Sequence, residues 1–383
     1  MNATVLMVST ATRWLGAARM PRSLAKAGFD VALLAPKDSL AAKSRFVAKV
    51  AFLPDNAVPM QWLLALIGMV GKVSPRLVVP CDEMAVRLLF NLALQPPPGL
   101  APEMRTRLFA LVRDSLGDPA FYMASIDKTM LPAAAESMGV RVPPYVVARS
   151  VEDARSFAKT HGYPVVLKRR FGFAGEGVAI VSTPSELARE AHRLIAPNQL
   201  DLGESASPRF LVQAFVHGPH HAQAMVSWNG VPLSGFAWER RVSTQPVKGQ
   251  TAVVRFVHSP ATLAFTETLC RGFGIGGFFC AQFILDSETG AAHLLEINRR
   301  IVTHMHMGER VQADLPAAIH AHLEGASPPA RVDLPGPFGP TVAVFPREWL
   351  RDPASRNLVD CAVDVPWDDP GLIEALLAMR NDT

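Results

Sequence analysis

Cysteine is scarce in this chain of 383 residues, and no two cysteines lie close together in the sequence. Cys81, Cys270, Cys280 and Cys361 form no CxxC pair and no other spacing typical of zinc ligands. A disulfide scaffold and a structural zinc site are therefore not expected. The reducing cytoplasm is the expected compartment.

Long apolar runs are also missing. The longest, Trp62 to Val70, is much shorter than the roughly 20 residues of a membrane-spanning helix, and the apolar stretch within Met1 to Trp14 is too short for a signal peptide. The formal charge of +4 is weak, and no run of Lys and Arg is interleaved with aromatic residues as in nucleic-acid-binding segments. We therefore expect a soluble protein that contacts neither membranes nor nucleic acids.

Two common phosphate-binding glycine motifs are absent as well. The expected first strand-to-helix turn, Ser9 to Gly16, lacks GxGxxG, so a dinucleotide bound in the usual manner is not expected. The chain has no GxxxxGK[ST] loop either. Arg13 in that turn is a candidate contact for an anionic ligand at a helix N-terminus, and a solvated surface arginine is the alternative.

The composition is otherwise that of an ordinary globular protein, with 49% hydrophobic and 19% charged residues in a chain long enough for two or three domains. In the first hundred residues short apolar strands alternate with helical patterns, which is typical of a parallel α/β sheet. Strands are expected at Thr4–Val8, Val31–Ala35 and Leu77–Pro80, with a helix over Ala17–Ala27. We interpret this half as Rossmann-like. From Tyr145 onward, antiparallel strands and helices indicate an α+β unit.

A glycine-rich segment after a lysine is the first candidate ligand site. The apolar strand Tyr163–Lys168 runs into Gly172, Gly175 and Gly177, and the strand Val178–Ser182 follows. Because the glycines join two strands, they describe a flexible hairpin whose backbone amides can fold over a phosphate chain, with Lys168 adding a positive charge. The alternative is a long glycine hairpin beside a surface lysine.

The strand-like run His293 to Arg300 is the second candidate. Glu296 and Asn298 are two residues apart, so in a β-strand both side chains point to one face. Gln282 lies on the preceding strand, which a hairpin would place beside Glu296. Such oxygen donors suit Mg²⁺, which takes one or two protein carboxylates and completes its shell with water and phosphate. A solvated strand face is the alternative for Glu296 and Asn298 alone.

Taken in order, these segments resemble the ATP-grasp superfamily, and most closely its carbamoyl-phosphate-synthase-like and carboxylate–amine ligase branch. The matching segments are Asp127-Lys128, the strand, lysine and flap at 165–181, the strand Phe210–Gly218, Gln282, and the Glu-x-Asn-x-Arg of Glu296, Asn298 and Arg300. The resemblance covers roughly Met123 to Gly325. It implies a Rossmann-like N-terminal domain at 1–118, an ATP-grasp fold of two α+β subdomains at 119–208 and 209–325, and a small C-terminal unit at 326–383.

The resemblance also implies roles for single residues. Lys168 would contact the α- and β-phosphates of ATP, with Lys128 also facing the nucleotide, and Arg300 would steady the transferred phosphoryl group or the acyl-phosphate. Gln282, Glu296 and Asn298 would hold Mg²⁺, with Mn²⁺ as a substitute. The remaining nucleotide contacts would be Gly172, Gly175, Gly177, Gln213, Ala214, Phe215, Val216 and His221.

The sequence departs from the family pattern at several positions. Arg299 stands where proline is common, and only Glu296 among the three expected metal ligands is charged. His220 and His221 follow Gly218, where the family often has a ribose-binding glutamate. Substrate contacts are assigned to a set of cationic side chains: Arg13, Arg240, Arg241, Arg255, Arg299 and His304. Exposed surface arginines are the alternative for Arg240 and Arg241, and core packing is the alternative for His304.

The resemblance implies an ATP-dependent ligase. Such an enzyme activates a carboxylate, for example of an amino acid, as an acyl-phosphate and joins it to an amine, forming an amide or peptide bond and releasing ADP and phosphate. The alternatives are a carboxylate kinase, a carboxylase-like enzyme, and a non-catalytic nucleotide-binding module on the same scaffold. The presence of Lys168, Glu296 and Asn298 favours catalysis. The expected partners are a small-molecule carboxylate and amine, and a homodimer is left open.

Overall fold

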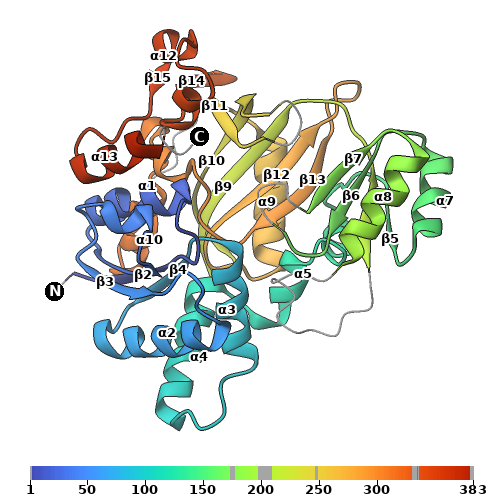
Figure 1. Cartoon of the computed structure of the whole chain (residues 1–383). Coiled ribbons are helices and arrows are strands. Elements are labelled where there is room, and N and C mark those ends of the chain that lie inside the picture. The colour runs from blue at the N-terminus through green and yellow to red at the C-terminus, as the bar shows by residue number, and fades with distance from the viewer. Residues whose placement is uncertain are drawn as a thin grey trace.

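The computed structural model describes residues 2–172, 177–196, 209–245, 249–329, 334 and 336–379. They form a mixed α/β structure with three sheets. Figure 1 shows the N-terminal sheet and a small sheet at opposite ends of the molecule, with a large sheet between them. None of the described helices has the length and apolar character needed to cross a membrane.

The N-terminal sheet has four parallel strands in the order β3-β2-β1-β4. Its elements are β1 (Thr4–Val8), α1 (Leu15–Lys26), β2 (Asp30–Pro36), η1 (Leu40–Lys43), β3 (Lys49–Leu53), α2 (Pro59–Val73), β4 (Leu77–Pro80) and α3 (Glu83–Leu94). The three strands and the helix expected from the alternating pattern are confirmed to within two residues. After Thr4 the β1 strand is apolar because alternate residues pack into different cores, Val5 on one face and Leu6 on the other.

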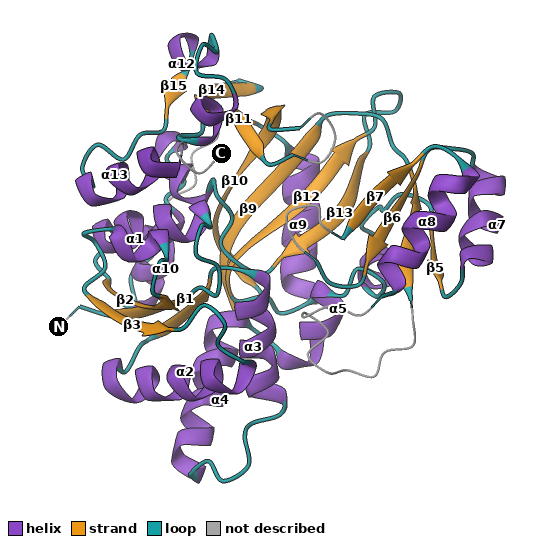
Figure 2. Ribbon diagram, in the orientation of Figure 1, coloured by secondary structure: helices purple, strands orange, loops and turns teal. Residues whose placement is uncertain are grey.

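The small sheet is antiparallel, in the order β5-β8-β6-β7. A helical connection of α4 (Pro102–Leu116), η2 (Pro119–Phe121), α5 (Tyr122–Ile126) and α6 (Leu131–Ser137) leads to it. Its own elements are β5 (Tyr145–Ala148), α7 (Val151–His161), β6 (Val165–Arg169), β7 (Val178–Val181), α8 (Pro184–Ile195) and β8 (Phe210–Ala214). Figure 2 shows α7 and α8 covering its outer side, where Phe157 and Leu187 join the core beneath the strands.

The large sheet has seven strands in the order β13-β12-β9-β10-β11-β14-β15. Its elements are β9 (His220–Trp228), β10 (Val231–Ser243), β11 (Thr251–Val257), α9 (Pro260–Gly272), β12 (Gly277–Leu285), β13 (Ala292–Asn298), η4 (Met305–Val311) and α10 (Leu315–Leu323). One continuous core contains Val5 of the N-terminal sheet and Trp238 and Val254 of the large sheet. The two sheets therefore pack against each other.

The C-terminal segment extends the large sheet and does not form a sheet of its own. It comprises β14 (Phe338–Ala343), α11 (Arg347–Arg351), α12 (Asn357–Asp360), β15 (Ala362–Val363) and α13 (Pro370–Ala378). The β14 strand pairs with β11, and β15 pairs with β14. In Figure 1 this segment lies above α1 of the N-terminal half.

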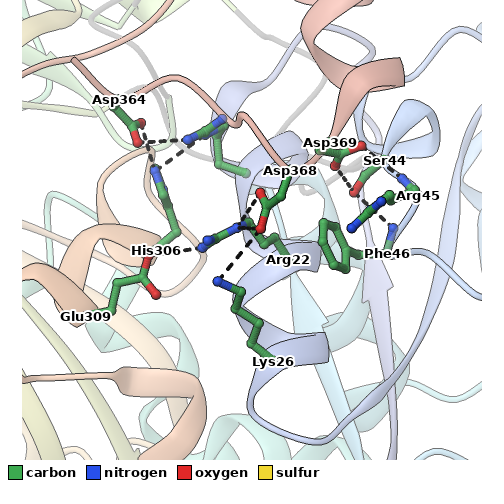
Figure 3. A network of polar contacts seen from close by, with 11 residues as sticks. Arg22, Lys26, Ser44, Arg45, Phe46, His306, Glu309, Asp364, Asp368 and Asp369 are labelled. Carbon is green, nitrogen blue, oxygen red and sulfur yellow. Dashed lines mark hydrogen bonds and ion pairs between the residues drawn. The ribbon is translucent and has the colours of Figure 1, made fainter.

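Aspartates of the C-terminal segment form hydrogen bonds and ion pairs with the N-terminal half (Figure 3). Asp368 accepts a hydrogen bond from Arg22 Nε of α1 at 2.7 Å, and Asp369 accepts one from the Ser44 hydroxyl, just after η1, at 2.5 Å. Asp364 is buried and accepts bonds at 2.8 Å from both Arg19 Nη2 and His306 Nε2. The segment is thus held to α1, η1 and η4 by charged groups.

Replacement of Asp364 by asparagine is expected to lower the free energy of unfolding by about 3 kcal/mol, because it leaves the buried Arg19 without a counter-charge. Burial alone would raise the pKa of Asp364, but His306 and Arg19 hold that pKa at about 2. The stabilisation is therefore complete above the ordinary aspartate pKa and is lost as the pH falls toward 2. Denaturant unfolding of both proteins at several pH values measures this difference.

The control is Asp360→Asn, which removes an exposed carboxylate from the same segment. Its effect on unfolding should stay within about 0.5 kcal/mol. Equal unfolding free energies for the parent protein and Asp364→Asn at neutral pH would contradict the role given to the buried pair.

Candidate active site

A cavity of about 590 Å³ lies between the small sheet and the large sheet. Its walls come from β6 and β7 on one side and from β9, β10, β12 and β13 on the other, with further residues from the segments that flank them. Lys168, Gln282, Glu296, Asn298 and Arg300 all line it. The structure therefore brings together side chains that are up to 132 residues apart in the sequence (300 − 168 = 132).

Polar side chains follow one another along one face of β13. Asn298 Nδ2 donates to Glu296 Oε1 at 3.1 Å, and Arg300 Nη2 donates to Asn298 Oδ1 at 3.0 Å. Arg300 Nε also donates to Glu83 Oε1, in the first turn of α3, at 2.9 Å. The predicted strand pairing is confirmed, since Gln282 of β12 lies directly opposite Glu296. This row combines a carboxylate, two amides and a guanidinium at the cavity wall.

Two lysines face the carboxylate of this row. Lys128 Nζ lies 3.6 Å from Glu296 Oε2, and Lys168 Nζ donates to the backbone oxygen of Leu295 at 3.2 Å. Only 6% of Lys168 is exposed. Burial lowers the pKa of Lys168 to about 8, and Glu296 only partly opposes that effect. Burial would raise the pKa of Glu296, but Lys128 and Lys168 lower it, so the carboxylate is ionised at neutral pH.

The glycine flap lies only partly within the described residues. Gly175 lies outside them, while Gly172 and Gly177 are described. The Gly172 oxygen accepts a hydrogen bond from Lys128 Nζ at 2.9 Å, and the Gly177 oxygen accepts one from the Arg169 amide at 2.7 Å. The base of the flap is therefore joined to one of the lysines that face Glu296.

The residues expected to hold the base and ribose of a nucleotide line the same cavity. These are Gln213, Ala214, Phe215, Val216 and His221. Gln213 is buried, and its Oε1 has no hydrogen-bond partner among the described residues; the same holds for Nδ1 of His221. An unsatisfied buried polar atom is costly, so both atoms fit a polar ligand that completes their bonding.

The donor set for a metal ion is small. Among the described residues, no group of three or more His, Cys, Asp or Glu side chains is arranged to hold a metal. Glu296 is the one carboxylate among the described side chains that line the cavity, and Gln282 and Asn298 add amide oxygens. This set fits a hard cation that shares its shell with phosphate oxygens and water, and it does not fit a site built from protein ligands alone.

The six cationic residues assigned to substrate divide into two groups. Arg240, Arg241 and His304 line the cavity. Arg13 instead lines a separate, shallow hollow at the carboxyl end of β1. Arg255 is bound to Glu239 Oε2 at 2.7 Å and lies 3.7 Å over the ring of Phe338, outside the cavity.

Arg299 is a correction to the substrate assignment. It is 1% exposed, does not line the cavity that Asn298 and Arg300 line, and donates to Ser125 Oγ at 2.8 Å and to the Leu116 backbone oxygen. Its guanidinium also lies over the ring of Phe90. Arg299 therefore joins β13 to the helical connection inside the core, and the structure gives it no contact with the cavity.

The sequence-based assignment of the site left out Glu83 and Arg347, and it noted His220 only beside His221 after Gly218. Glu83 lies in the first turn of α3, and no local signal links it to Arg300. His220 lines the cavity, and burial together with Arg240 and Lys168 lowers its pKa to about 4, so the ring is neutral at neutral pH. Arg347 reaches the cavity from α11 in the C-terminal segment, and no motif marked it.

Comparison with known proteins agrees with this geometry. The family model of the carbamoyl-phosphate synthase L chain, ATP-binding domain, matches residues 127–228. Pyruvate carboxylase 1 of Caenorhabditis elegans is 27% identical over 212 residues, which are 52% of this chain and 18% of that protein. The carbamoyl phosphate synthase large chain of Hyperthermus butylicus is 22% identical over 285 residues, 71% of this chain and 23% of that one. The chain thus spans about a fifth of the length of these relatives.

Solved structures share the fold at low sequence identity. The biotin carboxylase domain of the Hydrogenobacter thermophilus 2-oxoglutarate carboxylase, solved with MgADP and bicarbonate, superposes with a TM-score of 0.62 at 17% identity, covering 89% of this chain and 73% of that one. An L-amino acid ligase from Bacillus licheniformis gives 0.58 at 15% identity, covering 84% and 74%. Residues 127–228 thus match the ATP-binding domain of the carbamoyl-phosphate synthase L chain, and the chain is similar in sequence and in fold to enzymes of the ATP-grasp superfamily.

Proposed function

We propose that this protein is an ATP-dependent ligase that activates a carboxylate as an acyl-phosphate and joins it to an amine. The observation that carries the proposal is that Glu296, Asn298, Arg300 and Lys168 line one cavity, with Lys128 3.6 Å from Glu296. This arrangement places a metal-binding carboxylate, phosphate-binding cations and a guanidinium within reach of a single ligand. Phosphoryl transfer requires such positioning and charge neutralisation more than it requires covalent chemistry by the protein.

We expect ATP to lie in the cavity with its base toward β8 and its phosphates toward β13. The adenine and ribose would lie against Gln213 to Val216 and His221, where Gln213 Oε1 and His221 Nδ1 await partners. The phosphates would lie against Lys168 and Lys128, beside Gly172 and Gly177 at the base of the glycine flap. Mg²⁺ would be held by Glu296 with the oxygens of Asn298 and Gln282, and Mn²⁺ has the same preference for oxygen donors. When bound, the metal supplies positive charge to the transferred phosphoryl group.

The proposed reaction has two steps. A carboxylate oxygen attacks the γ-phosphorus, the bond to the β-phosphate oxygen breaks, and ADP leaves. The amine then attacks the acyl carbon, phosphate leaves with the bonding electrons, and the amine proton passes to solvent or phosphate. Arg300, oriented by Glu83 and Asn298, would neutralise charge on the transferring group, and buried Lys168 would hold the phosphates away from water.

Two further features are part of the proposal. We assign the chain to an N-terminal domain at 1–118, ATP-grasp subdomains at 119–208 and 209–325, and a C-terminal unit at 326–383 that completes the large sheet. A homodimer is the proposed assembly, and the similar biotin carboxylase domain from Hydrogenobacter thermophilus was solved as a dimer. The similarity to an L-amino acid ligase supports amide-bond formation as the second step.

The test is an ADP-release screen of the full chain with Mg·ATP, using amino acids and small carboxylates singly and in pairs. Ligation predicts ADP release that depends on a pair, with an amide product of the mass of the two substrates minus water. ADP release with a single acid would indicate a carboxylate kinase instead, and release with bicarbonate would indicate a carboxylase-like reaction. Binding of Mg·ATP without ADP release by any acid or pair would contradict catalysis.

A further inference from the structure

Arg347 is a buried cation that has no acidic partner among the residues described by the structure. It is 7% exposed, lines the cavity, and donates through Nη1 to the Thr251 backbone oxygen at 2.8 Å. Within the described residues it forms no ion pair. The cost of withdrawing a charge from water is several kcal/mol, and one neutral carbonyl offsets little of it. Burial accordingly lowers the pKa of Arg347 to about 10.

The neighbouring carboxylate does not serve Arg347. Glu348 is fully buried, and its oxygens accept hydrogen bonds from Arg351, Ser355 and Asn357. These contacts hold the turn after α11 together and leave Arg347 directed into the cavity. Glu348 therefore anchors α11, and the preceding residue, Arg347, adds positive charge to the cavity wall.

His304 and Trp238 line the same cavity. His304 is 6% exposed, and its Nε2 has no hydrogen-bond partner among the described residues. Burial lowers the pKa of His304 well below its usual value, Arg347, His306 and Arg240 lower it further, and Asp364 opposes them, so the imidazole is neutral. His304 lines the same cavity as the guanidinium groups of Arg347 and Arg240. The ring of Trp238 lies beside His304, at 5.1 Å between centroids.

The proposed nucleotide site does not account for these charges. Arg241 and Arg300, which also line the cavity, have carboxylate partners in Glu239 and Glu83. Lys168 faces the proposed phosphate position and Glu296. Arg240 has no ion-pair partner in the described part of the chain, and its nearest charged influence is Glu296. Asp364 also acts on His304, but its oxygens are bound by Arg19 and His306. Among the described residues, Arg240 and Arg347 therefore leave an excess of positive charge around His304.

We propose that Arg347, His304 and Arg240 form a second anion subsite, which binds a carboxylate other than the one that ATP activates. This inference rests on the proposed function and names its substrate class: one of the two substrates carries an additional carboxylate. A planar guanidinium binds a carboxylate through two parallel hydrogen bonds, and His304 Nε2 supplies a third polar contact. That carboxylate belongs either to a dicarboxylic acid or to an amino acid that acts as the amine.

Equilibrium binding to the full chain with Mg·ADP present tests the subsite without requiring turnover. One arm compares malonate, succinate, glutarate and adipate with the monocarboxylates of equal carbon number. The other compares glycine with methylamine and L-alanine with ethylamine. We expect at least one compound in one arm to bind tenfold or more tightly than its matched partner. That arm identifies the substrate that carries the carboxylate.

The variant Arg347→Met should reduce this preference to less than twofold while leaving the affinity for Mg·ADP unchanged. The control Arg356→Met removes an exposed arginine of the same segment and should keep the preference. Arg240→Met provides an independent second variant, since Arg240 has no ion-pair partner to lose within the described residues. It should weaken the preference at least threefold, so the test stands even where Arg347→Met fails to fold.

Two outcomes overturn the subsite: absence of any tenfold preference in the parent protein, or a preference that survives in both Arg347→Met and Arg240→Met. Neither outcome depends on ADP release. Failure of the proposed function appears instead as absent ADP release with every acid and pair. The two failures are therefore distinguishable.

Discussion

Replacement of Glu296 by glutamine should lower ADP release at least 10³-fold. Glu296 is the one carboxylate at the cavity wall formed by the described residues, and its neighbours Gln282 and Asn298 are neutral amides. Glutamine keeps the shape of the side chain and removes the charge that attracts the metal and balances Lys128 and Lys168. The measurement is ADP release with the best substrate pair from the screen, at saturating Mg²⁺ and ATP.

The matched control is Glu288→Gln, which changes an exposed glutamate in the turn of the same β12–β13 hairpin. It should retain full activity. Thermal unfolding of both variants verifies that each is folded. Undiminished ADP release by folded Glu296→Gln would rule out the proposed metal site.

The second large effect is a loss of ATP use above pH 8 that depends on Lys168. Burial lowers the pKa of Lys168 to about 8, so its ammonium group is charged at pH 7 and largely neutral at pH 9.5. Because only the charged form attracts the phosphates, kcat/KM for ATP should fall about tenfold per pH unit above 8. The pH profile of kcat/KM, measured with saturating acid and amine, reports this ionisation in the free enzyme.

Two variants identify the group that titrates. Lys168→Met should lower kcat/KM for ATP at least 10²-fold at pH 7 and abolish the decline above pH 8. Lys168→Arg keeps its charge throughout this range, so its profile should stay flat to pH 9.5. Lys159→Met, in the exposed last turn of α7, is the control and should show the parent profile. A decline above pH 8 that persists unchanged in Lys168→Arg would assign the ionisation to another group.

Local periodicity predicted much of the candidate site. Alternation along a strand places Glu296 and Asn298 on one face, and the structure shows their side chains hydrogen-bonded to each other. The same rule places Arg300 on that face and Arg299 on the other. Arg299 had nevertheless been assigned to substrate on its charge alone. Alternation along the chain alone would have placed Arg299 away from the cavity. The structure shows Arg299 buried in the core, where it donates to Ser125.

Other parts of the site had no local signal. Glu83 and Arg300 are 217 residues apart, and their ion pair exists because β4 ends beside β13 once the N-terminal sheet packs on the large sheet. No sequence motif marks Arg347 in the short helix α11. Its place at the cavity follows from the pairing of β14 with β11, which brings α11 to the Thr251 carbonyl.

The sequence by itself determined the strands, the lysine before the glycine hairpin and the oxygen donors of β13, since each depends on residues a few positions apart. Only the tertiary structure decided which charges face the cavity and which are neutralised. Ion pairing and burial depend on side chains that are far apart in the chain and meet after the sheets pack. For that reason Arg255 and Arg299 became structural residues, whereas Arg347 and His304 became the wall of a proposed substrate subsite.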